Sequence, residues 1–177
     1  MLKLIQDMRA AATTIQRALR IVHTAPSHPS TSFITFTRSL SSTRSIMSAS
    51  PYTVVSTDKA PAAIGPYVQA TKYNGLIYAS GCIPLDPKSM EVVSGGIEEQ
   101  TKQVFANVAA VLAASSSAPS HVLKCVVFLK SMNDFVAVNK LYAEFFGETK
   151  PARSCVEVAR LPKDVLVEIE FIAAEQK

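Results

Sequence analysis

The sequence predicts an α+β fold for residues 51–177, with a six-stranded mixed sheet and two helices on one face. Six short runs of alternating or continuous apolar residues, separated by Gly, Pro and Asn, indicate the strands. Two longer segments repeat their apolar residues at helical spacing. The order βββαβαββ leaves one face of the sheet without helices, and a single domain of this length can cover such a face by association.

The first three strands are expected at Tyr52–Ser56, Tyr67–Thr71 and Leu76–Ser80. Each is short and rich in β-branched or aromatic residues. Asn74-Gly75 separates the second strand from the third, and Asn-Gly between two apolar runs is a strong hairpin signal. The second and third strands are therefore expected to pair antiparallel.

Two helices flank a central strand. The first is expected over Gly96–Ala114, and the second begins near Asn133 and ends before Gly147 and Pro151. Their periodic residues are Ile97, Thr101, Val104, Phe105, Val108, Val111 and Leu112 in the first, and Phe135, Val138, Leu141, Tyr142 and Phe145 in the second. Between them, Val122–Leu129 is almost continuously apolar, as in a strand covered on both faces.

The last two strands, Ser154–Val158 and Val165–Ile172, are expected to form an antiparallel hairpin around a tight loop with Pro162. This hairpin places Arg153 directly opposite Glu168, with Cβ atoms roughly 5 Å apart. A guanidinium beside a carboxylate can hold a substrate carboxylate and direct a water at the adjoining carbon. Such a pair is also common on protein surfaces, where it contributes about 0–1 kcal/mol, and spacing alone favours this second interpretation.

The first 50 residues have a different composition. Residues 1–46 contain six basic side chains and one acidic side chain, are rich in Ser and Thr, and carry apolar residues that fit one side of a helix. This composition is typical of a mitochondrial transit peptide, with a disordered tail as the alternative. We therefore expect residues 1–50 to be a transit peptide and flexible leader, cleaved within Arg38–Ser50, and the protein to reside in the matrix. Met47 is a possible second start for a cytosolic form.

The leader carries the positive charge of the chain. The whole sequence has 18 basic and 14 acidic residues, so the rest has 12 basic and 13 acidic residues, a net charge of −1. This near-neutral segment has no basic stripe, and we expect neither nucleic-acid binding nor a membrane span. Cys82, Cys125 and Cys155 form no C-x-x-C pair, and His121 is the one histidine after the leader, so no metal site, disulfide framework or Ser–His catalysis is expected.

Four motifs resemble those of the Rid family, the reactive intermediate deaminases, also called YjgF-type proteins. They are Ala60-Pro-Ala-Ala-Ile-Gly-Pro-Tyr67, Ser80-Gly-Cys-Ile-Pro84, Asn133-Asp-Phe-Val-Ala-Val-Asn139, and the stretch Pro151–Val165 with Val167-Glu-Ile-Glu170. The resemblance runs from about Val54 to Ala173. It is closest to the RidA subgroup, whose hallmark is the Arg in Pro-Ala-Arg-Ser-Cys.

The resemblance implies a chorismate-mutase-like fold and a homotrimer with ligand pockets between subunits. The implied reaction is hydrolysis of 2-aminoacrylate and 2-iminobutyrate, which pyridoxal-phosphate enzymes release, to 2-oxo acids and ammonia. An imine carbon beside a carboxylate is already electrophilic, so the implied reaction uses no cofactor or metal. The substrate would be a small 2-imino or 2-enamino acid, and its removal would protect pyridoxal-phosphate enzymes.

The resemblance also implies roles for individual residues. Arg153 would hold the substrate carboxylate in a bidentate fork, and Glu168, rather than Glu170 on the same face, would activate water. Tyr67 would border the pocket and donate to the nitrogen or the water. The remaining implied contacts come from Ser80, Gly81, the wall and backbone at Cys155, and Asn139. Cys82 is a departure, because the family often has Gln at this position.

Two other functions fit the same resemblance. The first is a trimeric ligand-binding regulator of amino-acid metabolism that senses 2-oxo acids in the same clefts. The second is an RNA-directed inhibitor of translation, and the near-neutral charge of residues 51–177 argues against it.

Overall fold

The computed structural model describes residues 50–176, so the predicted transit peptide and the Met47 start lie outside the described residues. The sheet strands are β1 (Thr53–Val55), β2 (Ala70–Tyr73), β3 (Leu76–Cys82), β4 (Val122–Leu129), β5 (Ala152–Glu157) and β6 (Val167–Ala174). The α-helices of this part are α2 (Ile97–Ala114) and α3 (Phe135–Phe146). Short 3-10 turns are η1 (Pro119–His121), η2 (Met132–Asp134) and η3 (Pro162–Asp164). The predicted order βββαβαββ is confirmed.

Local sequence signals explain most of these boundaries. Asn74 and Gly75 both have positive φ, as the turn of a β2–β3 hairpin requires. The Glu99 carboxylate accepts a hydrogen bond from the backbone N–H of Gly96 (2.9 Å), which fixes the start of α2. Gly147, with φ of 56°, ends α3. The second strand begins at Ala70 rather than Tyr67, so Tyr67 lies in the loop before it.

The strand order is β1-β2-β3-β6-β4-β5, and it shows that the predicted C-terminal hairpin is wrong. Among the described strands, β5 pairs only with β4, in parallel, whereas β6 lies between β3 and β4 and is antiparallel to both. Arg153 therefore has Cys125 as its cross-strand partner, and Glu168 has Phe128. The expected direct pairing of Arg153 with Glu168 does not occur.

Two features of the chain explain the difference. β4, α3 and β5 form a βαβ unit, in which a helix connects two parallel strands, and this connection places β5 at the sheet edge. The segment between β5 and β6 is no tight turn, because Leu161 and Val165 are buried in a second apolar cluster with Ile83 and Leu85. The chain therefore leaves β5 through this cluster and re-enters the sheet on the other side of β4.

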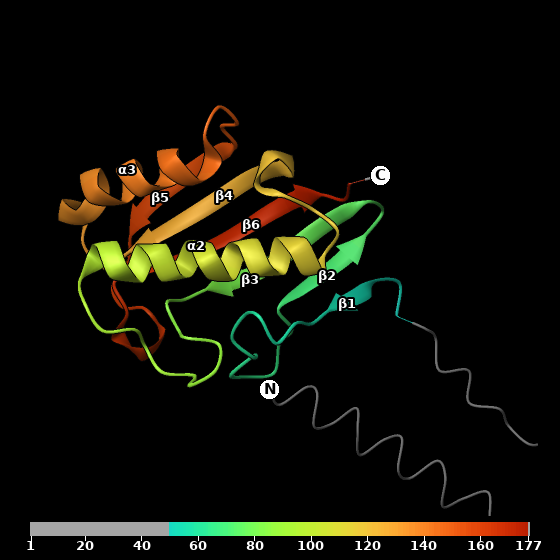
Figure 1. The fold of residues 1–177 in the computed structure, drawn as a ribbon, viewed down its shortest axis with the longest axis horizontal. Helices are drawn as coiled ribbons and strands as arrows, with labels where there is room; N and C mark the ends of the chain where they lie inside the picture. Colours follow the sequence, from blue (N-terminus) through green and yellow to red (C-terminus); the bar gives the residue numbers. More distant parts are fainter. Residues whose placement is uncertain (1–49, 177) are drawn as a thin grey trace, which may run out of the picture. The chain divides into compact units, whose positions relative to one another are not determined.

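α2 and α3 lie over the same face of the sheet (Figure 1). On β6 the residues Val167, Ile169, Phe171 and Ala173 are buried in the core beneath the helices. Glu168 and Glu170 alternate with them and point to the opposite face. That face, which no helix covers in residues 50–176, exposes Tyr78 and Val156. Neither α-helix of this part is long and apolar enough to cross a membrane.

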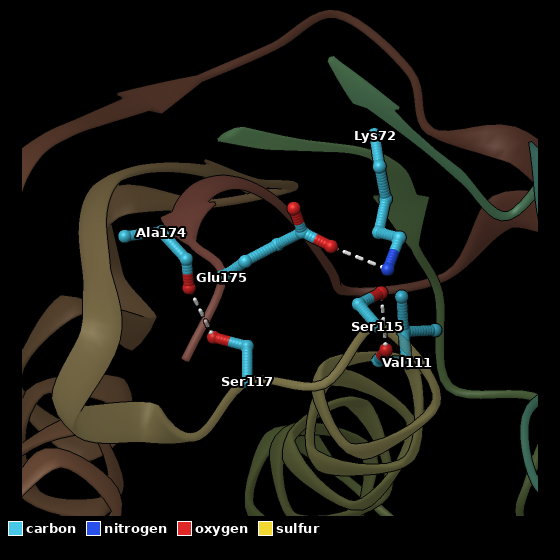
Figure 2. Close-up of polar contacts among 6 residues, drawn as sticks. All are labelled: Lys72, Val111, Ser115, Ser117, Ala174 and Glu175. Carbon is cyan, nitrogen blue, oxygen red and sulfur yellow. Dashed lines mark hydrogen bonds and ion pairs between the residues drawn. The ribbon is translucent and has the colours of Figure 1, made fainter. Parts of the chain in front are cut away.

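The C-terminal end of β6 is fixed to the end of α2 and to β2. Figure 2 shows the Ser117 hydroxyl donating to the carbonyl of Ala174 (2.7 Å) and Glu175 paired with Lys72. The Ser115 hydroxyl turns back to the carbonyl of Val111 (2.7 Å), as a side chain at a helix end often does. These contacts hold the end of β6 that is opposite to Glu168.

Candidate active site

The Glu168 cleft is a hollow of about 340 Å³. Its lining residues are Ile64, Tyr67, Ser80, Gly81, Ile83, Pro162 and Glu168. They come from the loop before β2, the end of β3, the η3 turn and β6. Four of the residues proposed from the sequence, Tyr67, Ser80, Gly81 and Glu168, are thus brought together.

The Glu168 carboxylate rests directly against the backbone of Gly81. A Cβ added at Gly81 would lie 1.8 Å from Oε1 and 2.7 Å from Cδ of Glu168, so a side chain at this position would force the carboxylate out of its place. Burial raises the pKa of Glu168, and the negative charge of Glu170 raises it further. A carboxylate with a raised pKa is a better proton acceptor near neutral pH than an ordinary Glu.

Tyr67 forms one wall of the cleft, with 45% of its surface exposed. Its hydroxyl oxygen accepts a hydrogen bond from the backbone N–H of Ile64 (3.3 Å), and its own N–H donates to the carbonyl of Gly65 (2.8 Å). A Cβ at Gly65 would lie 3.3 Å from the ring, so the absence of a side chain there lets the ring fold back on its loop. The hydroxyl proton of Tyr67 remains able to donate into the cleft.

Ser80 and Cys82 flank Gly81: the first anchors the strand end by a hydrogen bond, and the second is a partly buried thiol. The Ser80 hydroxyl donates to the carbonyl of Val68 (2.6 Å), which fastens the end of β3 to the loop before β2. Burial, the charge of Glu168 and the nearby Cys125 raise the pKa of the Cys82 thiol to about 12. Cys82 is therefore a neutral thiol at physiological pH and no nucleophile.

The second group of proposed residues surrounds Arg153. Its Nη1 donates to Oδ1 of Asn139 on α3 (2.7 Å). The guanidinium carbon lies 4.5 Å from the ring centroid of Tyr142 and 5.6 Å from that of Phe135. Within residues 50–176, no carboxylate pairs with this half-buried cation. The guanidinium is therefore held in place with N–H donors left for an anionic ligand.

Cys155 lies two residues beyond Arg153 on the same face of β5, partly packed against the core. Burial raises the pKa of its thiol, although the charge of Arg153 acts in the opposite direction. A protonated thiol fits the expected role as a wall. Arg153, Asn139, Tyr142, Phe135 and Cys155, here called the Arg153 cluster, thus place a cation without a neighbouring carboxylate in the described part of the chain among one amide, two aromatic rings and one thiol.

The Glu168 cleft and the Arg153 cluster lie on opposite faces of the sheet. Arg153 shares its face with its buried partner Cys125, beneath α3, whereas Glu168 alternates with the buried Val167 and Ile169. Strand β4 also separates them. One copy of the chain therefore presents the Glu168 carboxylate and the Arg153 guanidinium on different faces of its sheet.

The sequence did not reveal two polar residues that support the Glu168 cleft. Gln69 binds the loop before β2 through four hydrogen bonds, and Gln100 on α2 accepts one from the N–H of Leu166 (2.8 Å), just before β6. The partners of Gln69 lie in an irregular loop and the partner of Gln100 lies 66 residues away, so no helical or strand periodicity identifies either contact. No cluster of His, Cys, Asp and Glu within residues 50–176 could hold a metal ion.

The chain is similar to known proteins over most of residues 50–176. The profile of the family described as Endoribonuclease L-PSP matches residues 57–175. A RutC family protein of Pyrococcus horikoshii is 52% identical over 123 residues, or 70% of this chain and 98% of that protein. A candidate regulator of Lactococcus lactis, AldR, is 52% identical over 68% of this chain and 95% of its own. A 2-iminobutanoate/2-iminopropanoate deaminase of Salmonella typhimurium is 47% identical over 69% of this chain and 97% of its own.

Solved structures show the same fold. The crystal structure of yeast Mmf1 has a TM-score of 0.69 and 46% identity, covering 71% of this chain and 99% of that one. The crystal structure of E. coli TdcF with bound serine has a TM-score of 0.67 and 39% identity, covering 70% of this chain and 99% of that one.

Proposed function

Because the chain belongs to the endoribonuclease L-PSP (YjgF/Rid) family, we propose that it hydrolyses 2-enamine and 2-imine acids to 2-oxo acids and ammonia. The substrates are 2-aminoacrylate and 2-iminobutyrate, and their removal protects pyridoxal-phosphate enzymes. The observation that carries this proposal is the Glu168 carboxylate, which has a raised pKa and rests against Gly81 in an open cleft. A relative at 47% identity is named as a deaminase of this type.

The reaction needs two functions that the chain supplies. Arg153, held by Asn139 and Tyr142, offers a planar fork to the substrate carboxylate. Glu168 accepts a proton from water as the oxygen adds to the imine carbon, and that proton passes to the substrate nitrogen. The tetrahedral adduct then expels ammonia as its hydroxyl proton passes through Glu168 to the nitrogen, and the 2-oxo acid remains. Tyr67 donates a hydrogen bond from its hydroxyl to the nitrogen or the water.

The two functions meet only if a second copy completes the site. Arg153 and Glu168 lie on opposite faces of one sheet, so the Arg153 cluster of one subunit has to cover the Glu168 cleft of another. The sheet face without helices exposes Tyr78 and Val156, which are suited to burial between copies. We therefore propose a homotrimer with three equivalent sites between subunits, a closed ring of heterologous contacts. The bound serine in E. coli TdcF is also consistent with a site for small amino-acid-like ligands in this fold.

A ligand-binding regulator is the second candidate. The observation that favours it is the relative named as a candidate regulator, which is 52% identical. The same Arg153 cluster would then sense a 2-oxo acid without turning it over. RNA-directed activity, which the family description suggests, has no basic surface to support it in a segment of net charge −1. We also propose that the matrix, reached through the predicted transit peptide, is where the protein acts.

The test measures the rate at which 2-iminobutyrate, made in situ by threonine dehydratase, disappears and releases ammonia and 2-oxobutyrate. The wild type should exceed the uncatalysed rate, and Arg153→Ala should return it to that rate. Arg160→Ala is the matched control, because Arg160 pairs with Asp164 on the exposed surface. If folded, assembled wild type does not accelerate the reaction, the deaminase proposal is rejected. Titration with 2-oxobutyrate would then test the ligand-binding regulator.

A further inference from the structure

Gln69 makes more polar contacts than any other side chain near the Glu168 cleft. Its Oε1 accepts a hydrogen bond from the N–H of Thr57 (2.7 Å). Its Nε2 lies within donating distance of three carbonyls, those of Thr57 (2.9 Å), Ala60 (3.1 Å) and Pro61 (2.8 Å). Two amide hydrogens thus serve three acceptors, and one carboxamide joins both ends of a loop segment to the start of β2.

The backbone of Gln69 is fixed to the strand beneath the cleft. Ser80 donates from its N–H to the carbonyl of Gln69 (3.1 Å) and from its hydroxyl to the carbonyl of Val68 (2.6 Å). The next residue, Gly81, is the one on which the Glu168 carboxylate rests. A continuous path of contacts therefore runs from the floor of the cleft through Gln69 to the loop.

Tyr67 depends on that loop for its position. In the described residues, the hydrogen bonds of Tyr67 go only to Ile64 and Gly65, which are members of the same loop. Its ring is almost half exposed. The loop is held against the sheet by burial of Ala60 and by the carboxamide of Gln69. Motion of the segment 57–61 would therefore carry the wall of the cleft with it.

We propose that Gln69 is a positioning residue that sets the distance between Tyr67 and Glu168 by holding the loop of residues 57–67 against β3. This inference rests on the proposed deaminase function and names a residue that acts through Tyr67 rather than on the substrate. Only a carboxamide of this length supplies one acceptor and two donors to these four backbone groups. Gln69→Glu keeps the shape but directs an anion at three carbonyl oxygens.

The test is a double-mutant cycle on kcat and KM with Tyr67→Phe, Gln69→Glu and the double variant. Both single substitutions should lower kcat/KM. When Gln69→Glu is already present, Tyr67→Phe should lower kcat/KM further by less than about twofold, because the Tyr67 hydroxyl is then already out of place. Gln69→Met, neutral and of similar length, repeats the cycle if Gln69→Glu does not fold. Effects that multiply, or a kcat/KM within about twofold of wild type for a folded Gln69 variant, would overturn the proposal.

Amide hydrogen exchange provides a readout that does not depend on turnover. The N–H groups of Thr57 and Ile64, which donate to Gln69 and Tyr67, should exchange faster in Gln69→Met, while the N–H of Ile169 in β6 should not change. Unchanged exchange at Ile64 would overturn the positioning role. If the wild type shows no activity, the deaminase proposal fails, and hydrogen exchange at Ile64 alone would then decide whether Gln69 positions the loop.

Discussion

Arg153 and Glu168 lie on opposite faces of the same sheet, with strand β4 between their strands. The guanidinium lies beneath α3, bound to Asn139, whereas the carboxylate opens into a cleft on the other side. A single copy of the chain cannot place both groups on one small substrate. The proposed trimer would bring them together, with the exposed residues on the helix-free face buried between copies.

Arg153→Lys should lower kcat/KM by about tenfold to a hundredfold, mainly through KM. Lys keeps the positive charge but loses the planar fork and the contact with Asn139, equivalent to about one charge-assisted hydrogen bond. Steady-state kinetics with 2-iminobutyrate checks this expectation. Arg160→Lys, which keeps its charge beside Asp164, should stay close to wild type. Equal effects of the two substitutions would contradict a carboxylate-binding role for Arg153.

Gly81→Ala should inactivate the protein while leaving it folded. The new Cβ would overlap Oε1 and Cδ of Glu168, and the end of that flexible side chain can move away at small cost. Activity assays and thermal unfolding, measured together, separate the two effects. Gly96→Ala is the matched control, because its Cβ would find the nearest atom at 3.8 Å. An active Gly81→Ala variant would show that the position of Glu168 against Gly81 is not needed.

Glu168→Gln should stabilise the protein at pH 7 but not at pH 4. Because the folded state raises the pKa of Glu168, it holds the proton more tightly than the unfolded chain does. The resulting stability is complete below the ordinary pKa of 4.5 and is lost as the pH rises through the folded value. Glu168→Gln stays neutral and avoids this loss. Thermal unfolding at the two pH values provides the measurement, and a difference from wild type that does not change with pH would contradict the raised pKa.

Asn107→Ala should destabilise the fold by about 2–4 kcal/mol, because it leaves two buried carbonyls without a donor. The buried Asn107 amide donates to the carbonyls of Ile83 and Leu85, both at 3.0 Å, and so fixes the chain that leaves the cleft. Urea denaturation measures the cost. Gln103→Ala removes one contact to Asn107 and should cost under about 1 kcal/mol. Similar losses in the free energy of unfolding for Asn107→Ala and Gln103→Ala would mean that water replaces the Asn107 amide as the donor to the two carbonyls.

Regular elements were predictable because their signals are local. Val122–Leu129 was predicted residue for residue, since eight nearly continuous apolar residues allow few alternatives. The pairing of β5 was not, because alternation reveals which face a residue occupies and not which strand lies beside it. The decisive features were long-range: the helical connection from β4 to β5 and the burial of Leu161 and Val165.

The candidate site divides in the same way. Sequence motifs named residues of both the Glu168 cleft and the Arg153 cluster, but the cross-strand reading put Arg153 and Glu168 on one face. The role of Gln69 was not predicted, because it depends on hydrogen bonds to the carbonyls of Thr57, Ala60 and Pro61, and such contacts leave no periodic pattern in the sequence. The close contact between the Glu168 carboxylate and Gly81 could not be predicted either, because the sequence does not distinguish a glycine required by such a contact from any other glycine.

Subunit complementation tests the central claim most directly. Arg153→Ala and Glu168→Gln should each be inactive alone, yet trimers assembled from an equal mixture should recover roughly one site in four, because each site takes the two residues from different copies. Mixing wild type with the double variant should give the same fraction. Sites within one subunit would instead give no recovery in the first mixture and about half of the sites in the second, which would contradict the account.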